Sequence, residues 1–120
     1  MYTLAEYVGS AYVNDWGTLW LALGNFLDDF KREPKIERLE TPLRPFDLRT
    51  DAFLAGVAEH LARQYQLPLP QWAGESKYYL EKPFFPCGST GDYRIFLLIE
   101  SPVAFKSRNI FVAENVLSRA

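Results

Sequence analysis

Apolar residues recur at helical spacing along the stretch from Asp15 to about Lys31. Those that follow one another at intervals of three and four are Trp16, Leu19, Trp20, Leu23, Leu27 and Phe30. Such spacing places the side chains on one face of an amphipathic helix. Asp15 is expected to cap the start of this helix, because its carboxylate can accept a hydrogen bond from a free backbone N–H. A shorter helix is predicted before it, with Thr3 as its cap.

A second long stripe predicts another helix in the middle of the chain. Its apolar members are Phe53, Leu54, Val57, Leu61 and Tyr65. Either Thr50 or Asp51 is expected to cap this helix. The helix should stop before Pro68, because proline cannot continue the backbone hydrogen bonding of a helix.

Residues 33–50, between the two predicted helices, mix charged residues with three prolines, which are Pro34, Pro42 and Pro45. Each proline removes a backbone donor and restricts the residue before it, so long regular structure is not expected here. We predict an extended connector with one helical turn around Ile36 and Leu39.

The segment Tyr93–Ile99 contains a short apolar run, for which periodicity alone does not separate a buried strand from a buried helix. The sequence offers no second convincing strand to pair with it, and an unpaired buried strand would leave its backbone groups unsatisfied. We therefore predict a helix. Ser101 and Pro102 follow, and they resemble the N-cap and the first-turn proline of another short helix.

Together these elements predict a mainly α fold, a compact single-domain bundle of about 5–6 helices. The length of 120 residues fits one domain at about 100–200 residues per domain. Within it, residues 1–32 form the N-terminal helices, 33–50 the proline-rich connector and 51–120 the helical core. The run from Pro83 to Gly91 is predicted to be an irregular aromatic loop.

Composition changes this picture mainly through the aromatic residues. The chain has 9 Phe, 7 Tyr and 3 Trp, more than so small a core readily holds. Some of them should lie at the surface or in an interface, and a homodimer is one way to bury them. The formal net charge of −2 argues against nucleic acid as the partner, since phosphate binders normally carry a basic face.

The single cysteine, Cys87, suits a reducing compartment. The N-terminus lacks the charged and apolar pattern of a signal peptide. No apolar run approaches the roughly 18 residues of a membrane span. We therefore expect a cytoplasmic protein without membrane contact.

Few residues point to catalysis. His60 is the only histidine, and no pair of Cys or His residues stands at metal-ligand spacing, so neither a metal nor a cofactor is expected. The catalytic alternative uses Cys87 as a nucleophile with His60 as its base, but no local motif of a cysteine enzyme surrounds them. Residues 88–91 are small, yet they lack the lysine of a phosphate-binding loop. We predict that the protein is not an enzyme.

Binding by aromatic and basic side chains is the favoured hypothesis. Phe84 and Phe85 stand between two prolines, where one ring could anchor the loop while the other projects into an interface, or both could fill the core. The predicted partner-binding residues are Trp72, Phe84, Phe85, Phe105, Lys106 and Arg108. In an alternative interpretation, Lys106, Arg108 and Arg119 contact nucleic-acid phosphate.

Residues 51–120 also carry short motifs in a characteristic order. These are Asp51–Ala55, His60–Ala62, Leu67–Trp72, Leu80, Pro83–Phe85, Ser101–Phe105, Arg108–Phe111 and Leu117–Ala120. The set resembles a poorly characterised domain from the C-terminal part of bacterial helix-turn-helix regulators. Such domains are often encoded beside nucleotidyltransferase-like proteins, in pairs that look like toxin–antitoxin systems. Residues 1–50 show no helix-turn-helix, so the resemblance does not extend to direct DNA reading.

The resemblance implies a protein-binding half, namely an antitoxin that inhibits a nucleotidyltransferase-like toxin by direct binding. No catalytic residues come with it. Two alternatives stay open: an accessory domain of a transcriptional regulator that contacts nucleic acid, and a small enzyme that uses Cys87 and His60.

Overall fold

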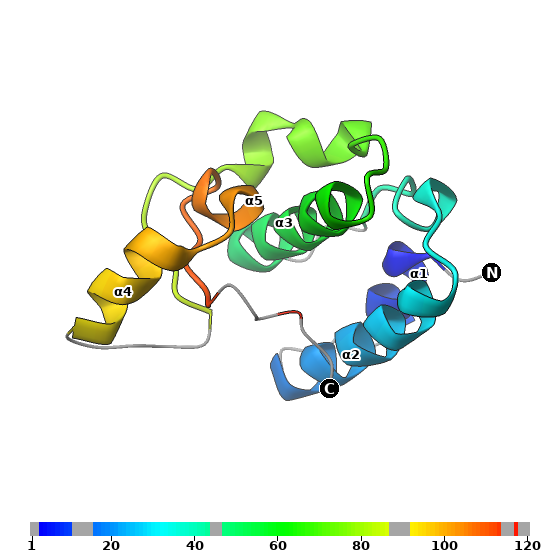
Figure 1. Ribbon diagram of the computed structural model, residues 1–120, viewed down its shortest axis with the longest axis horizontal. Helices are drawn as coiled ribbons and strands as arrows, with labels where there is room; N and C mark the ends of the chain where they lie inside the picture. Colours follow the sequence, from blue (N-terminus) through cyan, green and yellow to red (C-terminus); the bar gives the residue numbers. More distant parts are fainter. Residues whose placement is uncertain (1–2, 11–15, 44–46, 87–91, 114–116, 118–120) are drawn as a thin grey trace.

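Helices account for nearly all regular structure in the computed structural model, which describes residues 3–10, 16–43, 47–86, 92–113 and 117 (Figure 1). The α-helices are α1 (Leu4–Ser10), α2 (Trp16–Arg32), α3 (Leu48–Gln64), α4 (Asp92–Glu100) and α5 (Val103–Lys106). Three short 3₁₀ turns lie in the connecting segments: η1 (Ile36–Arg38), η2 (Gln71–Gly74) and η3 (Ser76–Tyr78). Within the described ranges the one isolated β contact is a parallel bridge between Phe84 and Ile110. The mainly α prediction is confirmed.

Helix α3 lies at the centre of the molecule, with α1 and α2 on one side and α5 and the later 3₁₀ turns on the other (Figure 1). Every residue of α3 from Ala52 to Glu59 is buried. Gly56 allows α5 to come close, since a Cβ there would lie only 2.7 Å from Cδ1 of Phe105. The radius of gyration of 13.5 Å matches the roughly 13–14 Å expected of a compact chain of this length.

Aromatic rings join α2 to α3. The Trp20 and Phe53 rings meet edge to face with centroids 5.5 Å apart, and the Phe30 and Tyr65 rings do so at 5.2 Å. Such pairs contribute about 0.5–1.5 kcal/mol beyond the area that they bury. The predicted stripe of α2 therefore faces the core, where its buried members are Leu19, Leu23, Leu27 and Phe30.

Helix α1 begins with a reciprocal pair of hydrogen bonds. The Glu6 backbone N–H donates to Thr3 Oγ1 at 3.1 Å, and the Thr3 backbone N–H donates to Glu6 Oε1 at 3.3 Å. This arrangement is a capping box, which satisfies two donors that the first helical turn leaves free. The predicted role of Thr3 is confirmed, whereas the predicted cap at Asp15 lies outside the described residues.

Helix α3 begins earlier than the sequence predicts. Asp47 is its cap: the Asp47 Oδ1 atom accepts a hydrogen bond from the Thr50 backbone N–H at 2.9 Å, and Oδ2 accepts one from the Thr50 hydroxyl at 2.8 Å. The prediction of Thr50 or Asp51 as the cap is wrong, because both residues already lie inside the helix. The helix ends at Gln64, before Pro68, as predicted.

The described part of the connector is mostly irregular, as its prolines predict. Its one regular element between α2 and residue 43 is η1, which covers the expected turn at Ile36. Arg38 and Leu39 at the end of this turn are buried, so the connector packs against the helices and forms part of the core.

The apolar run of Tyr93–Ile99 is helical, as predicted, and forms most of α4. This helix projects from the body of the molecule (Figure 1). Leu97 is buried, whereas Leu98 and Ile99 are 38% and 68% exposed. The helix therefore contributes exposed apolar side chains to the surface.

Ser101 does not cap the helix that follows it. Its hydroxyl donates to the Leu97 carbonyl oxygen at 2.6 Å and accepts from the Val112 backbone N–H at 2.9 Å. Pro102 occupies the N-cap position of α5 without a side-chain hydrogen bond, and the helix begins at Val103. The predicted cap at Ser101 is wrong, because its hydroxyl ties the end of α4 to the C-terminal segment instead.

Within the described ranges, no helix combines the length and the apolar character needed to cross a membrane.

Candidate partner-binding site

The aromatic segment Pro83–Pro86 is held in place by its backbone. The Phe84 N–H donates to the Asn109 carbonyl oxygen, and the Phe111 N–H donates to the Phe84 carbonyl oxygen, each at 2.9 Å. Asn109 adopts a φ of 67°, a left-handed conformation that asparagine tolerates better than most residues. This turn brings the chain from α5 back alongside Phe84, so the segment is fixed on both sides of the ring.

Both rings of the aromatic segment are half-buried. Phe84 packs against the edge of the core, and the Phe85 ring lies 5.4 Å from the Phe111 ring, centroid to centroid. Neither ring projects freely, and neither is fully enclosed in the core.

An arginine covers each of these rings. The Arg49 guanidinium carbon lies 5.3 Å from the centre of the Phe84 ring, and that of Arg94 lies 4.3 Å from the centre of the Phe85 ring. Both arginines are exposed. Among the described residues, neither forms an ion pair with an acidic side chain. Aromatic contact therefore places both positive charges at the surface.

Leu98 extends this region along α4. It lies one helical turn after Arg94, which puts the two side chains on neighbouring positions of the helix surface. We call this set the aromatic–arginine surface; it consists of Arg49, Phe84, Phe85, Arg94 and Leu98. It contains two arginine–ring pairs on consecutive residues of the aromatic segment and an exposed leucine one helical turn after Arg94. Arginine and aromatic residues are enriched at protein interfaces.

Three of the predicted partner-binding residues lie in the interior. The Trp72 indole N–H donates to the Leu39 carbonyl oxygen at 2.7 Å, and the Phe105 ring stacks on Phe53 with centroids 5.5 Å apart. Arg108 is only 1% exposed. The structure thus places the predicted contact residues Phe105 and Arg108 inside the fold, whereas the largely buried Trp72 still lines a surface groove. Lys106 is exposed.

Arg108 is the centre of a buried hydrogen-bonded cluster. Its Nη1 donates to Glu59 Oε1 at 2.5 Å and to the Ala104 carbonyl oxygen at 2.7 Å, and its Nη2 donates to the Ala73 carbonyl oxygen at 2.6 Å. The Tyr79 ring covers the guanidinium at 4.7 Å. The Arg108–Glu59 cluster thereby joins α3, η2 and α5, and it removes Arg108 from the alternative phosphate-contacting set. Arg119 of that set lies outside the described residues.

Glu59 is ionised within this cluster. Burial alone would raise the pKa of its carboxyl group, but hydrogen bonds from Arg108 and Arg63 outweigh burial and lower the pKa below its ordinary value. The second of these bonds, from Arg63 Nε to Glu59 Oε2, measures 2.8 Å. The pair is therefore a structural ion pair, with both carboxylate oxygens occupied.

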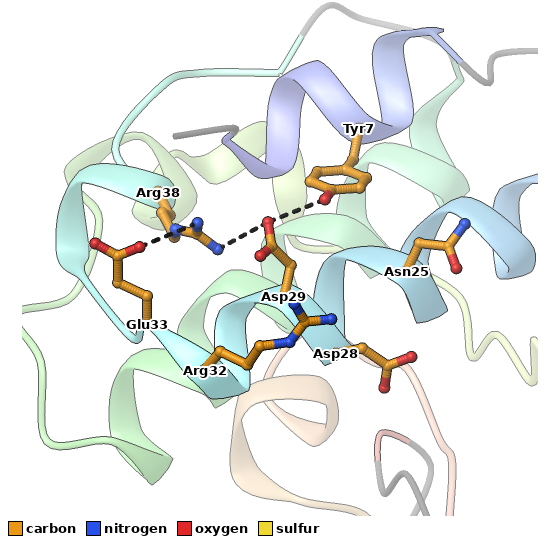
Figure 2. A pocket seen from close by; sticks show the side chains of 7 residues that line it. All are labelled: Tyr7, Asn25, Asp28, Asp29, Arg32, Glu33 and Arg38. Atoms are coloured by element: carbon orange, nitrogen blue, oxygen red, sulfur yellow. Dashed lines mark hydrogen bonds and ion pairs between the residues drawn. The ribbon is translucent and has the colours of Figure 1, made fainter.

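A polar cleft of about 580 Å³ lies where α1, α2 and η1 meet (Figure 2). Figure 2 shows Asp29 between Tyr7 and Arg38, with Glu33 on the far side of the Arg38 guanidinium. The Tyr7 hydroxyl donates to Asp29 Oδ2 at 3.0 Å, and Arg38 Nη1 lies 3.2 Å from the same oxygen. Glu33 Oε2 is 3.7 Å from Arg38 Nη2. We call this set the Tyr7–Arg38 chain.

The Tyr7–Arg38 chain satisfies its own charges. The hydrogen bond from Tyr7, and then the charge of Arg38, lower the pKa of the Asp29 carboxyl group. Arg38 is 3% exposed, and its Nε and Nη1 have no hydrogen-bond partner, so its contact with Asp29 is an ion pair. Because these contacts join α1, α2 and η1, the groups of the cleft serve to hold the N-terminal elements together.

Of the two residues in the catalytic alternative, the structure describes only His60. The His60 ring lies 5.8 Å from the Phe105 ring, and burial lowers the pKa of the imidazole. Cys87 lies outside the described residues. Over the part of the chain that is described, no group of three His, Cys, Asp or Glu side chains could hold a metal ion.

Arg49 and Arg94 are functional candidates that the sequence analysis missed. Arg49 lies at the end of the proline-rich connector and Arg94 in the ambiguous apolar run, and no periodic signal marks an arginine that covers a ring. No protein-family model matches the chain, and neither a curated protein nor a solved structure is significantly similar to it.

Proposed function

We propose that this chain is a non-enzymatic protein-binding module whose contact is the aromatic–arginine surface. One observation carries the proposal: two exposed arginines cover two half-exposed phenylalanine rings and have no acidic partner among the described residues. A guanidinium that stacks on a ring keeps its N–H edge free to bind a carboxylate. Such a preorganised group loses little conformational freedom on binding.

The partner that suits this surface has carboxylates beside an apolar side chain. Opposite charges across an interface accelerate encounter and fix orientation, while the apolar contacts with Phe84, Phe85 and Leu98 supply burial. Nucleic acid would also satisfy the arginines, but the net charge of −2 works against a polyanion as the main partner.

In its specific form, the proposal is that the chain acts as an antitoxin in the cytoplasm and inhibits a nucleotidyltransferase-like toxin by direct binding. The support for this form is the resemblance of residues 51–120, which includes Pro83–Phe85, to antitoxin-like domains. The half-exposed position of both rings agrees with a contact made by this segment.

Co-expression with the adjacent gene product tests the proposal. We expect the neighbour to be toxic alone, this chain to relieve the toxicity, and the two proteins to purify as a complex. The double variant Arg49→Glu/Arg94→Glu should lose both relief and co-purification, because it places like charges against the acidic partner. Lys31→Glu makes the same kind of change at an exposed position on α2 and serves as the control.

Two results would overturn the proposal. Absence of binding and of any genetic interaction would remove the antitoxin form. A stable complex that the double variant forms as well as the native chain would show that the contact lies elsewhere.

A further inference from the structure

A groove of about 600 Å³ lies between the connector and the segment that follows α3. The cyan connector and the green segment before η2 lie at the same end of the molecule in Figure 1, away from α4. Apolar side chains make most of the lining: Ile36, Pro42, Pro68, Leu69, Pro70 and Trp72. We call this site the proline groove.

The walls of the proline groove are stiff. The Trp72 indole N–H donates to the carbonyl oxygen of Leu39, which pins the connector to η2. Tyr78 holds the Trp72 ring from the other side, edge to face at 5.6 Å between centroids. Proline fixes its own φ angle, so the three proline positions add little flexibility. A groove with such walls is preformed, which reduces the entropic cost of binding.

The charge of the groove is acidic. Among the described residues that line it, the ionisable ones are Glu40 and Glu75 and the remaining polar one is Gln71, so none of these is a cation. Glu75 pairs with Lys77 at 3.3 Å, but both side chains are about half exposed, and such a surface pair contributes little. Within the described residues Glu40 has no ion pair. Leu69, on the same lining, is 52% exposed.

We propose that the proline groove binds an extended peptide segment in which a lysine or arginine flanks an apolar side chain. The apolar side chain would cover Leu69 and the prolines, and the cation would approach Glu40 and Glu75. An acidic segment or a phosphate would instead be repelled by the carboxylates of Glu40 and Glu75. The groove is therefore opposite in charge to the aromatic–arginine surface and recognises a different segment.

Selection from a random linear peptide library on the immobilised full chain tests this inference. We expect the enriched peptides to carry Lys or Arg within a few positions of Leu, Ile, Val or Pro. One enriched peptide is then synthesised, and its affinity is measured by fluorescence anisotropy. The variant Glu40→Lys/Glu75→Lys should bind it at least about tenfold more weakly, because the attraction becomes repulsion.

Further variants test whether the peptide binds in the proline groove. Glu37→Lys changes the same charge in η1 but does not line the groove, so it should retain the affinity within about twofold. Leu69→Ser should weaken binding about fivefold through lost apolar contact. Arg49→Glu/Arg94→Glu should leave it unchanged. Thermal unfolding of each variant confirms that its fold is intact.

The inference is overturned by any of three results. These are a library without enrichment over the unselected pool, enrichment of peptides that lack basic residues, and an enriched peptide whose affinity is unchanged in Glu40→Lys/Glu75→Lys.

Discussion

Arg108 and Arg38 are almost equally buried, yet they serve the fold differently. Arg108, at 1% exposure, donates to a carboxylate and two backbone carbonyls at 2.5–2.7 Å. Arg38, at 3% exposure, has carboxylates at 3.2 and 3.7 Å and leaves Nε and Nη1 without a hydrogen bond, whereas Arg108 leaves only Nε without one. Burial alone therefore does not measure what a charged side chain contributes. The number and length of its hydrogen bonds decide it.

The acidic partners of the two arginines also differ in how far they are exposed to water. The side chain of Glu59 is 10% exposed, whereas those of Asp29 and Glu33 are 26% and 47% exposed. Water can therefore solvate Asp29 and Glu33 if Arg38 is removed, but it reaches Glu59 poorly. The Arg108–Glu59 cluster should stabilise the core, and the Tyr7–Arg38 chain should mainly orient α1 and η1 on α2.

The substitution Arg108→Met gives the largest expected effect. It keeps most of the side-chain volume but leaves Glu59 buried without its main countercharge, which typically costs about 3–5 kcal/mol in the free energy of unfolding. Denaturant unfolding measures the loss. Lys106→Met, at the exposed last residue of α5, should change the free energy by less than about 0.5 kcal/mol. Equal effects of the two substitutions would contradict the structural role of Arg108.

The substitution Gly56→Val tests the close packing beside the Arg108–Glu59 cluster. Its Cβ would meet the Phe105 ring, which is fully buried and stacks on Phe53, so we expect a loss of about 2 kcal/mol. Gly74→Ala is the control, because nothing lies within 4 Å of a Cβ at that position. The thermal unfolding midpoints of both variants provide the measurement, and an unchanged midpoint for Gly56→Val would refute the contact.

The substitution Arg38→Met should destabilise the protein less than Arg108→Met does. Its acidic partners keep access to water, so no carboxylate is left in a dry environment. Denaturant unfolding under the same conditions compares the two variants directly. If Arg38→Met costs as much as Arg108→Met, the distinction between the two arginines fails.

The smallest expected effect belongs to Tyr7→Phe, which removes only the hydroxyl that donates to Asp29. The pKa of Asp29 should rise toward its ordinary value of 3.8, and NMR titration of the carboxyl group measures this rise. A lowered pKa adds stability above the unfolded value and loses it as the pH falls through the folded value. The native chain should therefore exceed the variant in stability near neutral pH, and the difference should shrink below about pH 4. A stability difference between the two proteins that grew as the pH fell would contradict this prediction.

The sequence predicts the helical elements because their signals are local. The stripe of α2 and that of α3 repeat every three or four residues, and Thr3 stands three residues before Glu6, as a capping box requires. The start of α3 was harder to predict, because an exposed Leu48 separates Asp47 from the stripe and makes Thr50 look like the boundary.

The sites were beyond prediction because their contacts are distant along the chain. Arg108 looks like a surface cation until Glu59, 49 residues earlier, is seen to occupy its guanidinium. Trp72 looks like an exposed aromatic residue until Leu39 accepts its indole hydrogen. The two arginines that cover Phe84 and Phe85 belong to no sequence pattern. Local spacing therefore predicts the helices, whereas which side chains stay exposed depends on contacts between residues that are distant along the chain.

The separation of Glu59 from Arg108 also has a consequence for biosynthesis. At roughly 5–20 residues per second, a ribosome adds Arg108 several seconds after Glu59, because the two are 49 positions apart. During this interval the Glu59 carboxylate has Arg63 as a partner, but the buried partner Arg108 has not been made. Closure of α3 against α5 is therefore a late event of folding on the ribosome, and nascent chains stalled before residue 108 should remain open and accessible to proteases.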